Sequence, residues 1–152
     1  MIDCVPCSLT AELPDVPPRE AVWVDERWRV AHAFGAHLPG WLVVLPRRHV
    51  ESLDELDDAE AAELGPLLRD ATAAVRTVVG CAKTYVGLFA EKEGFAHVHF
   101  HVIPRMPDQP HDARGPRIFT TLGATLAESE RDAISLRLRA AWPIPRSARM
   151  QL

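Results

Sequence analysis

The sequence has no asparagine, only two lysines and no apolar run long enough to cross a membrane. Its longest apolar run covers residues 41–45, whereas a bilayer-spanning helix needs ~20 residues. Residues 1–7 have neither the basic nor the apolar region of a secretory signal, so we expect a cytoplasmic protein without membrane contact. The formal net charge of −4 also disfavours a nucleic-acid partner, because nucleic-acid-binding domains are usually basic.

The composition is that of one soluble domain with a core of its own. The 152 residues are 47% hydrophobic and 25% charged, which is ordinary for a globular protein. Three cysteines are an odd number, and they do not form a secreted disulfide pattern. Cys4 and Cys7 form a C-x-x-C pair, which in a reducing compartment indicates metal binding or redox chemistry. Seven histidines provide groups for proton transfer or metal binding near neutral pH.

Hydrophobic patterning predicts a sheet with one main helix. Apolar residues at helical spacing cover residues 58–79, and a second helical stretch covers residues 126–141. A capping box is predicted at residues 52–55. Proline-rich loops are predicted at residues 8–20 and 107–117, and strands at residues 21–25, 28–34, 41–45, 83–90 and 97–103. This order favours an α+β fold with an antiparallel sheet over repeated βαβ units.

Three histidines alternate with apolar residues in the segment His97-Val-His-Phe-His101. Alternate side chains of a strand point to opposite faces, so His97, His99 and His101 share one face. The segment is compatible with three interpretations. The histidines are solvent-facing residues of an ordinary strand, ligands of a metal ion, or a nucleophile with neighbours that orient it. Strict alternation of three histidines makes the first interpretation the least favoured.

This segment and the residues before it resemble the histidine triad (HIT) superfamily. The family signature of three histidines separated by single apolar residues matches residues 97–103. Residues 38–50 resemble the family segment in which Pro-Gly, an apolar strand and Pro-Arg-Arg-His follow one another. The resemblance covers residues 1–106, and residues 107–152 add little to it. It implies one HIT domain over the whole chain, with a five-stranded antiparallel sheet, one main helix and a C-terminal helix, paired as a homodimer.

The resemblance also implies a reaction on nucleotides. The middle histidine of the family attacks the α-phosphorus and forms a nucleotidyl-histidine intermediate, which water hydrolyses; this position is His99. The third histidine, His101, lies at the phosphate, and the first, His97, supports the other two. The implied activity is that of a hydrolase or nucleotidyl transferase. Its substrate would be a nucleoside phosphoramidate, a dinucleoside polyphosphate or a related anhydride.

A zinc site is implied by the same resemblance. One bacterial branch of the family carries an N-terminal C-x-x-C and binds zinc with four side chains, which here are Cys4, Cys7, His49 and His97. Two cysteines and two histidines suit a closed, tetrahedral structural site. The ion would attach the N-terminal segment to the sheet. Two idle cytosolic thiols are the alternative.

The predicted substrate pocket departs from the family pattern. Glu93 and Gly94 stand where family members have Gln and Ser or Thr, and no asparagine is present to complete the phosphate loop. The ribose-binding aspartate of the family aligns near Ala33. Glutamate beside a phosphate weakens binding unless a cation offsets it. The candidate substrate-binding residues are Lys92, Glu93, Gly94, Arg105 and His32.

These departures leave two alternatives open beside a nucleotide hydrolase or transferase. The first is a zinc-stapled scaffold that binds a small nucleotide or phosphorylated ligand without turnover. The second is an enzyme with its metal at His99 and His101 and a non-nucleotide reaction.

Overall fold

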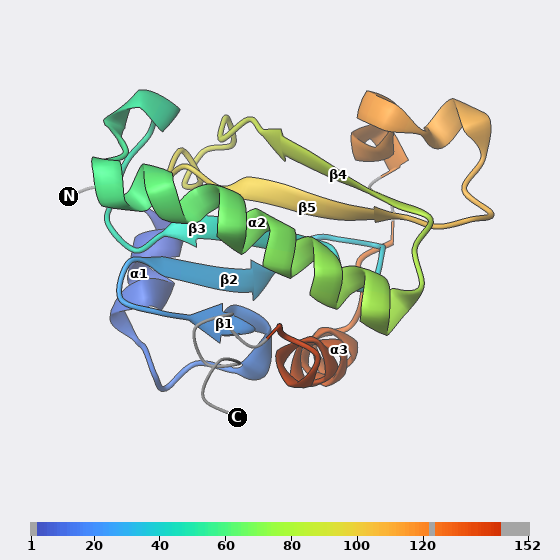
Figure 1. The fold of residues 1–152 in the computed structure, drawn as a ribbon, viewed down its shortest axis with the longest axis horizontal. Helices are drawn as coiled ribbons and strands as arrows, with labels where there is room; N and C mark the ends of the chain where they lie inside the picture. Colours follow the sequence, from blue (N-terminus) through green and yellow to red (C-terminus); the bar gives the residue numbers. More distant parts are fainter. Residues whose placement is uncertain (1–2, 122–123, 144–152) are drawn as a thin grey trace.

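An antiparallel sheet of five strands forms the centre of the fold. The structure is a computed structural model, and it describes residues 3–121 and 124–143. The five strands are β1 (Trp23–Val24), β2 (Trp28–His32), β3 (Leu42–Pro46), β4 (Lys83–Leu88) and β5 (Phe100–Arg105). Their order in the sheet is β1-β2-β3-β5-β4, and every neighbouring pair is antiparallel (Figure 1). The predicted α+β fold with a five-stranded antiparallel sheet is confirmed.

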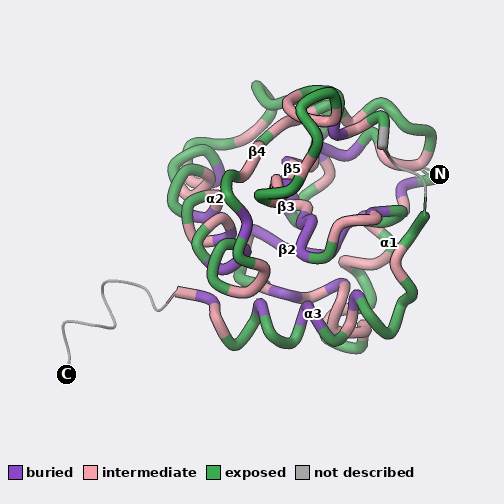
Figure 2. Tube along the Cα trace, turned by 90° about the vertical axis from the view of Figure 1, so that its right-hand side faces the viewer, coloured by how far each residue is buried: buried purple, intermediate pink, exposed green. Residues whose placement is uncertain are grey.

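Helices lie on both sides of this sheet. The α-helices are α1 (Val5–Ala11), α2 (Asp58–Val79) and α3 (Glu128–Ala140), and the short 3-10 helices are η1 (Pro18–Glu20), η2 (Leu53–Glu55), η3 (His111–Ala113) and η4 (Gly115–Thr121). Figure 1 shows α2 crossing one face of the sheet, and Figure 2 shows the sheet between α2 and α1. No helix within the described residues has both the length and the apolar character needed to span a membrane.

The main helix has the bounds that the sequence predicts. Asp57 accepts a hydrogen bond from the backbone N–H of Glu60, whose carboxylate accepts from the N–H of Asp57, so a capping box starts α2. The capping box predicted at residues 52–55 is wrong, because Ser52 makes no side-chain capping bond to η2. Gly80 ends α2 in the left-handed conformation.

The two faces of the sheet bury different side chains. Val44, Phe100 and Val102 belong to the cluster that packs on the apolar side of α2. Trp41 and Ile103 belong to a second cluster on the opposite face. Odd-numbered positions of β3 and β5 therefore face away from α2, and His101 is among them because it pairs with Val43 in the register.

The loop predicted for residues 8–20 is partly wrong, because it includes the end of α1 and all of η1. Pro6 is tolerated in the first turn of a helix, where backbone N–H groups lack partners in any case. The buried Arg29 guanidinium holds this region against β2. It donates to the Glu20 carboxylate at 3.1 Å, to the Pro6 carbonyl at 3.3 Å and to the Thr10 hydroxyl at 3.2 Å.

The histidine segment is less regular than a continuous strand from residue 97. β5 begins at Phe100, so His97 and His99 precede it. The reason is local: the carbonyl of His97 accepts a hydrogen bond from the His99 ring, and the N–H of Val98 donates to Val50 instead of to a neighbouring strand. Val98 is nevertheless fully buried in the α2 cluster, so the predicted alternation of apolar and histidine side chains holds.

Candidate active site and metal centre

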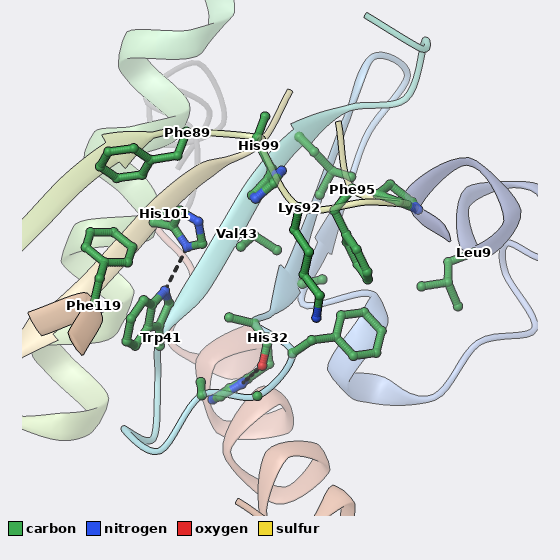
Figure 3. Close-up of a pocket in the computed structure, with 18 of the residues that line it drawn as sticks. Leu9, His32, Trp41, Val43, Phe89, Lys92, Phe95, His99, His101 and Phe119 are labelled. Carbon is green, nitrogen blue, oxygen red and sulfur yellow. Dashed lines mark hydrogen bonds between the residues drawn. The ribbon is translucent and has the colours of Figure 1, made fainter. Parts of the chain in front are cut away.

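A pocket of about 720 Å³ opens on the face of the sheet away from α2. His99 and His101 lie between its two ends (Figure 3). The first end contains the aromatic side chains of Trp41, Phe89 and Phe119, and the second contains Leu9, Lys92 and Phe95. The pocket thus combines two of the three triad histidines with mostly apolar walls, which is typical of small-molecule sites.

A hydrogen bond to the backbone fixes the orientation of the His99 ring. Its Nδ1 lies 2.8 Å from the backbone carbonyl oxygen of His97. A carbonyl only accepts hydrogen bonds, so Nδ1 carries the proton and donates it. In the neutral form of the ring, the lone pair is then on Nε2. An imidazole oriented in this way is a nucleophile of fixed direction.

His101 is the neighbouring ring on the same face, with its centroid 4.9 Å from that of His99. The indole N–H of Trp41 donates to His101 Nδ1 at 3.0 Å (Figure 3). Burial, followed by the charge of His99, lowers the pKa of His101 to about 4. His101 is therefore a neutral imidazole at physiological pH.

His32 lines the same pocket and is fully buried. The N–H of Gly40 donates to His32 Nε2 at 3.0 Å, and His32 Nδ1 lies 3.3 Å from the carbonyl of Ala33. Both ring nitrogens are engaged with backbone, so His32 shapes the loop that forms the pocket wall. Gly40 has a φ of +85°, and a Cβ there would lie 2.9 Å from Val79, so glycine is required.

Acid is expected to destabilise the protein through His32. Burial lowers its pKa to about 4 from an ordinary value of 6.5, so below pH 6.5 the unfolded chain binds a proton that the native state excludes. The free energy of unfolding should fall by about 2 kcal/mol at pH 5 through this group. Urea unfolding of the wild type and of His32→Gln, which keeps an acceptor for Gly40, at pH 7.5 and pH 5 measures this contribution. An identical loss of stability in both proteins would contradict the expectation.

The other predicted substrate residues are not all brought together. Lys92 lines the pocket, and its ammonium lies 5.3 Å from the centre of the Phe95 ring. Glu93 and Gly94 form a turn outside the pocket lining, where the Gly94 carbonyl accepts from the N–H of Val5 at 3.0 Å. Arg105 ends β5 opposite Lys83 in the register and does not line the pocket.

The four predicted metal ligands form a cluster beside the pocket. The thiols of Cys4 and Cys7 lie 3.6 and 3.4 Å from His97 Nδ1, and Cys7 lies 3.3 Å from His49 Nδ1. All four ligand atoms lie within 4.8 Å of one another. Tetrahedral zinc with bonds of 2.0–2.3 Å places its ligand atoms about 3.3–3.8 Å apart. The donor set and its spacing therefore fit zinc.

Hydrogen bonds on the far side of each imidazole support this arrangement. His97 Nε2 lies 2.7 Å from the carbonyl oxygen of Pro46, and His49 Nε2 lies 3.2 Å from the Glu51 carboxylate. Both partners accept, so both Nδ1 atoms are left with lone pairs for an ion. Burial, followed by the neighbouring Cys4, raises the pKa of Cys7 to about 11. The Cys7 thiol thus needs a cation to persist as a thiolate.

His97 connects the metal centre to the pocket. Its ring belongs to the ligand cluster, while its carbonyl oxygen accepts from the His99 ring. Its side chain is fully buried and does not line the pocket. His97 is therefore a positioning residue for His99.

Several residues that line the pocket are not predicted as site residues from the sequence. On a predicted strand, Trp41 is more simply interpreted from sequence as a core or dimer contact, and no sequence signal singles out Phe89 or Phe119. The register of β3 against β5 is the information that was lacking, because it puts Val43 opposite His101 and thereby Trp41 on the same face. Leu9 comes from a helix that the sequence does not predict.

Comparison with known proteins supports one family. The family model described as HIT domain matches residues 15–108. Proteins named AP-4-A phosphorylase from two Mycobacterium tuberculosis strains, CDC 1551 / Oshkosh and ATCC 25618 / H37Rv, are each 31% identical to the chain over 107 residues. The match covers 66% of the chain and 54% of these relatives, so the chain spans about half the length of the curated relatives it matches.

Solved structures share the fold. A Zn-bound histidine triad family protein from Mycobacterium smegmatis superposes with a TM-score of 0.67 at 20% identity, over 91% of each chain. A hypothetical histidine triad nucleotide-binding protein from Sulfolobus tokodaii strain7 superposes with a TM-score of 0.68 at 18% identity, over 89% of this chain and 91% of that one. At 18–20% sequence identity, these similarities show a shared fold.

Proposed function

Because this chain belongs to the HIT domain family, we propose that it is a nucleotide hydrolase or nucleotidyl transferase with His99 as its nucleophile. The observation that carries the proposal is the hydrogen bond from His99 Nδ1 to the carbonyl of His97, at the centre of a pocket sized for a small molecule. It leaves the Nε2 lone pair directed away from the backbone. The AP-4-A phosphorylase name of the relatives supports nucleotide chemistry in general.

The reaction proceeds in two displacements at the α-phosphorus. His99 Nε2 attacks, a nitrogen–phosphorus bond forms, and the bond from phosphorus to the leaving nitrogen or oxygen breaks while the leaving group takes up a proton. Water, or another acceptor in a transferase, then attacks the same phosphorus. The nitrogen–phosphorus bond breaks, the attacking oxygen loses its proton, and His99 is regenerated.

Trapping of the covalent intermediate tests this mechanism against a scaffold that binds without turnover. The protein is mixed with adenosine phosphoramidate and quenched in base, because nitrogen–phosphorus bonds are labile in acid. Intact-mass measurement should show an adenylyl adduct, and fragmentation should place it on His99. Bound nucleotide without an adduct or product would establish the scaffold instead.

The charges of the pocket favour a substrate with little negative charge. Its cationic lining residues are Arg29, which is paired with Glu20, and Lys92, which shares the lining with Glu91. Two positive and two negative side chains cancel formally. A polyphosphate chain needs cationic partners that a phosphoramidate with a single phosphate does not need. We therefore place nucleoside phosphoramidates and related adenylates ahead of dinucleoside polyphosphates as substrates.

We expect Lys92 to contribute to binding of the substrate phosphate, and we expect Lys83, the other lysine of the chain, to make no contribution. Lys92→Gln should lower kcat/KM for adenosine phosphoramidate by about 10-fold, the loss of one charge-assisted contact. Lys83→Gln makes the same change at the exposed first residue of β4, away from the pocket lining, and should leave kcat/KM unchanged. Equal effects of the two substitutions would contradict the assignment of Lys92.

For the metal centre we propose zinc in a structural role. Cys4, Cys7, His49 and His97 would hold it, and when bound it would cross-link the start of α1 to the segment before β5. The alternative metal site at His99 and His101 has less support. The described residues place neither ring in a group of three potential ligands.

Three further expectations belong to this proposal. We propose that residues 1–152 form one HIT domain, that two copies pair as a homodimer, and that the protein acts in the cytoplasm. Sedimentation of the purified protein and imaging of a tagged copy measure the second and third.

A further inference from the structure

We infer that Trp41 is a positioning residue that fixes His101 as a neutral imidazole with its proton on Nε2. Its role in turnover rests on the proposed function, whereas the tautomer itself does not. The geometry is direct: Trp41 Nε1 lies 3.0 Å from His101 Nδ1. An indole N–H donates and never accepts, so His101 Nδ1 must be the acceptor and must lack a proton.

Packing prevents the indole from turning away. Trp41 is 2% exposed, and the Phe119 ring lies across it with centroids 5.5 Å apart. Phe119 also contacts the His101 ring at 5.3 Å, so both partners are held by the same aromatic side chain. The donor and acceptor are thus fixed before any ligand binds.

The charged form of His101 conflicts with this arrangement. An imidazolium carries protons on both nitrogens, so its Nδ1–H would face the N–H of Trp41. The ionisable side chains nearby offer little compensation: His99 is the nearest ring, His37 lies beyond Trp41, and the remaining ionisable residues of the pocket lining are His32, Glu20, Arg29, Glu91 and Lys92. His101 therefore keeps one proton, on the nitrogen not bonded to Trp41.

The consequence is that adjacent histidines have opposite tautomers. His99 has its proton on Nδ1 and its lone pair on Nε2, whereas His101 has its proton on Nε2. His101 is then a hydrogen-bond donor to a phosphoryl oxygen or to the leaving atom, and not a base. Trp41 sets this division of roles without touching the reacting atoms.

Nitrogen NMR of the histidine rings tests the tautomer. In the wild type, His101 Nδ1 should resonate as an unprotonated nitrogen and Nε2 as a protonated one from pH 6 to 8. Trp41→Phe keeps an aromatic ring but removes the N–H, so the two tautomers of His101 should mix and its pKa should rise. Wild-type His101 with a protonated Nδ1, or an unchanged tautomer in Trp41→Phe, would overturn the inference.

Two controls separate the hydrogen bond from general packing effects. Phe119→Leu removes the aromatic ring but keeps an apolar side chain against both partners and leaves the indole N–H, so His101 should keep its tautomer. Trp23→Phe makes the same chemical change as Trp41→Phe outside this pocket, where the indole donates to Asp25 at 3.4 Å, and should leave His101 unaffected. Loss of the tautomer in either control would show that the Trp41 N–H is not what fixes it.

Kinetics tests the role in turnover. Trp41→Phe should lower kcat for adenosine phosphoramidate by about 10-fold, the effect of one neutral hydrogen bond, with KM nearly unchanged. An unchanged kcat with the NMR signature altered would overturn the positioning role and leave His99 as nucleophile. A wild type without any turnover would instead overturn the proposed function, while the tautomer would still be read from the spectrum.

Discussion

His99→Ala is expected to abolish turnover of adenosine phosphoramidate, with kcat reduced by more than about 10³-fold. The substitution removes the attacking nitrogen, and no neighbouring ring can replace it. His101 is held by Trp41 in the opposite tautomer, and His97 is buried with its ring in the metal cluster. Single-turnover measurements with product detection provide the rate, and intact-mass measurement should show that no adenylyl adduct forms.

A matched control makes this result specific. His111 is exposed in η3 and does not line the pocket, so His111→Ala should retain the wild-type rate. The zinc content and melting temperature of His99→Ala should equal those of the wild type, because the lost ring makes one hydrogen bond and is not a metal ligand. Wild-type turnover in His99→Ala would exclude His99 as the nucleophile.

Removal of zinc is expected to produce the largest loss of stability. Binding to the native state alone contributes about 4 kcal/mol when free zinc is about 1,000 times its Kd. For a domain of this size that corresponds to a fall in Tm of about 10 °C. Differential scanning calorimetry before and after chelation, with readdition of zinc, measures the change, and elemental analysis gives the stoichiometry.

The cysteines offer a matched pair of variants. Cys7→Ser should lose zinc and reproduce the low Tm of the chelated protein, because it removes a ligand atom that contacts both metal-site histidines. Cys81→Ala removes a thiol from the α2 core and should retain one zinc per chain. The proposed centre is wrong if Cys7→Ser keeps its metal, or if chelation leaves Tm unchanged.

The sequence predicted the fold well where local patterns extend over many residues. The bounds of α2 followed from the apolar spacing of residues 58–79, and each strand was found within a few residues. Helix α1 was missed because seven residues with one proline give too short a periodic pattern to recognise. The start of β5 was predicted too early in the chain. The ring of His99 donates to the backbone carbonyl of His97, which in a continuous strand would accept a hydrogen bond from the neighbouring strand.

The candidate site was predictable only in part. The triad and the four metal ligands could be named from sequence because they match residues of a family that the chain resembles, and the structure brings the four ligands together. The walls of the pocket depend on strand register and on contacts between distant segments. Trp41 and Phe119 therefore could not be assigned, and Glu93, Gly94 and Arg105 turned out to lie outside the pocket lining.

Each end of the pocket includes one wall residue from a flank of the chain. Leu9 comes from α1 and Phe119 from η4, whereas the segment that matches the HIT family, residues 15–108, contains neither. Each end of the pocket thus combines side chains of the family segment with one side chain from a flank. Substitutions at these two flank positions would therefore reshape the ends of the pocket and leave His99 and His101 in place, whereas a fragment trimmed to the family segment would lose both walls together with Cys4 and Cys7 of the metal cluster.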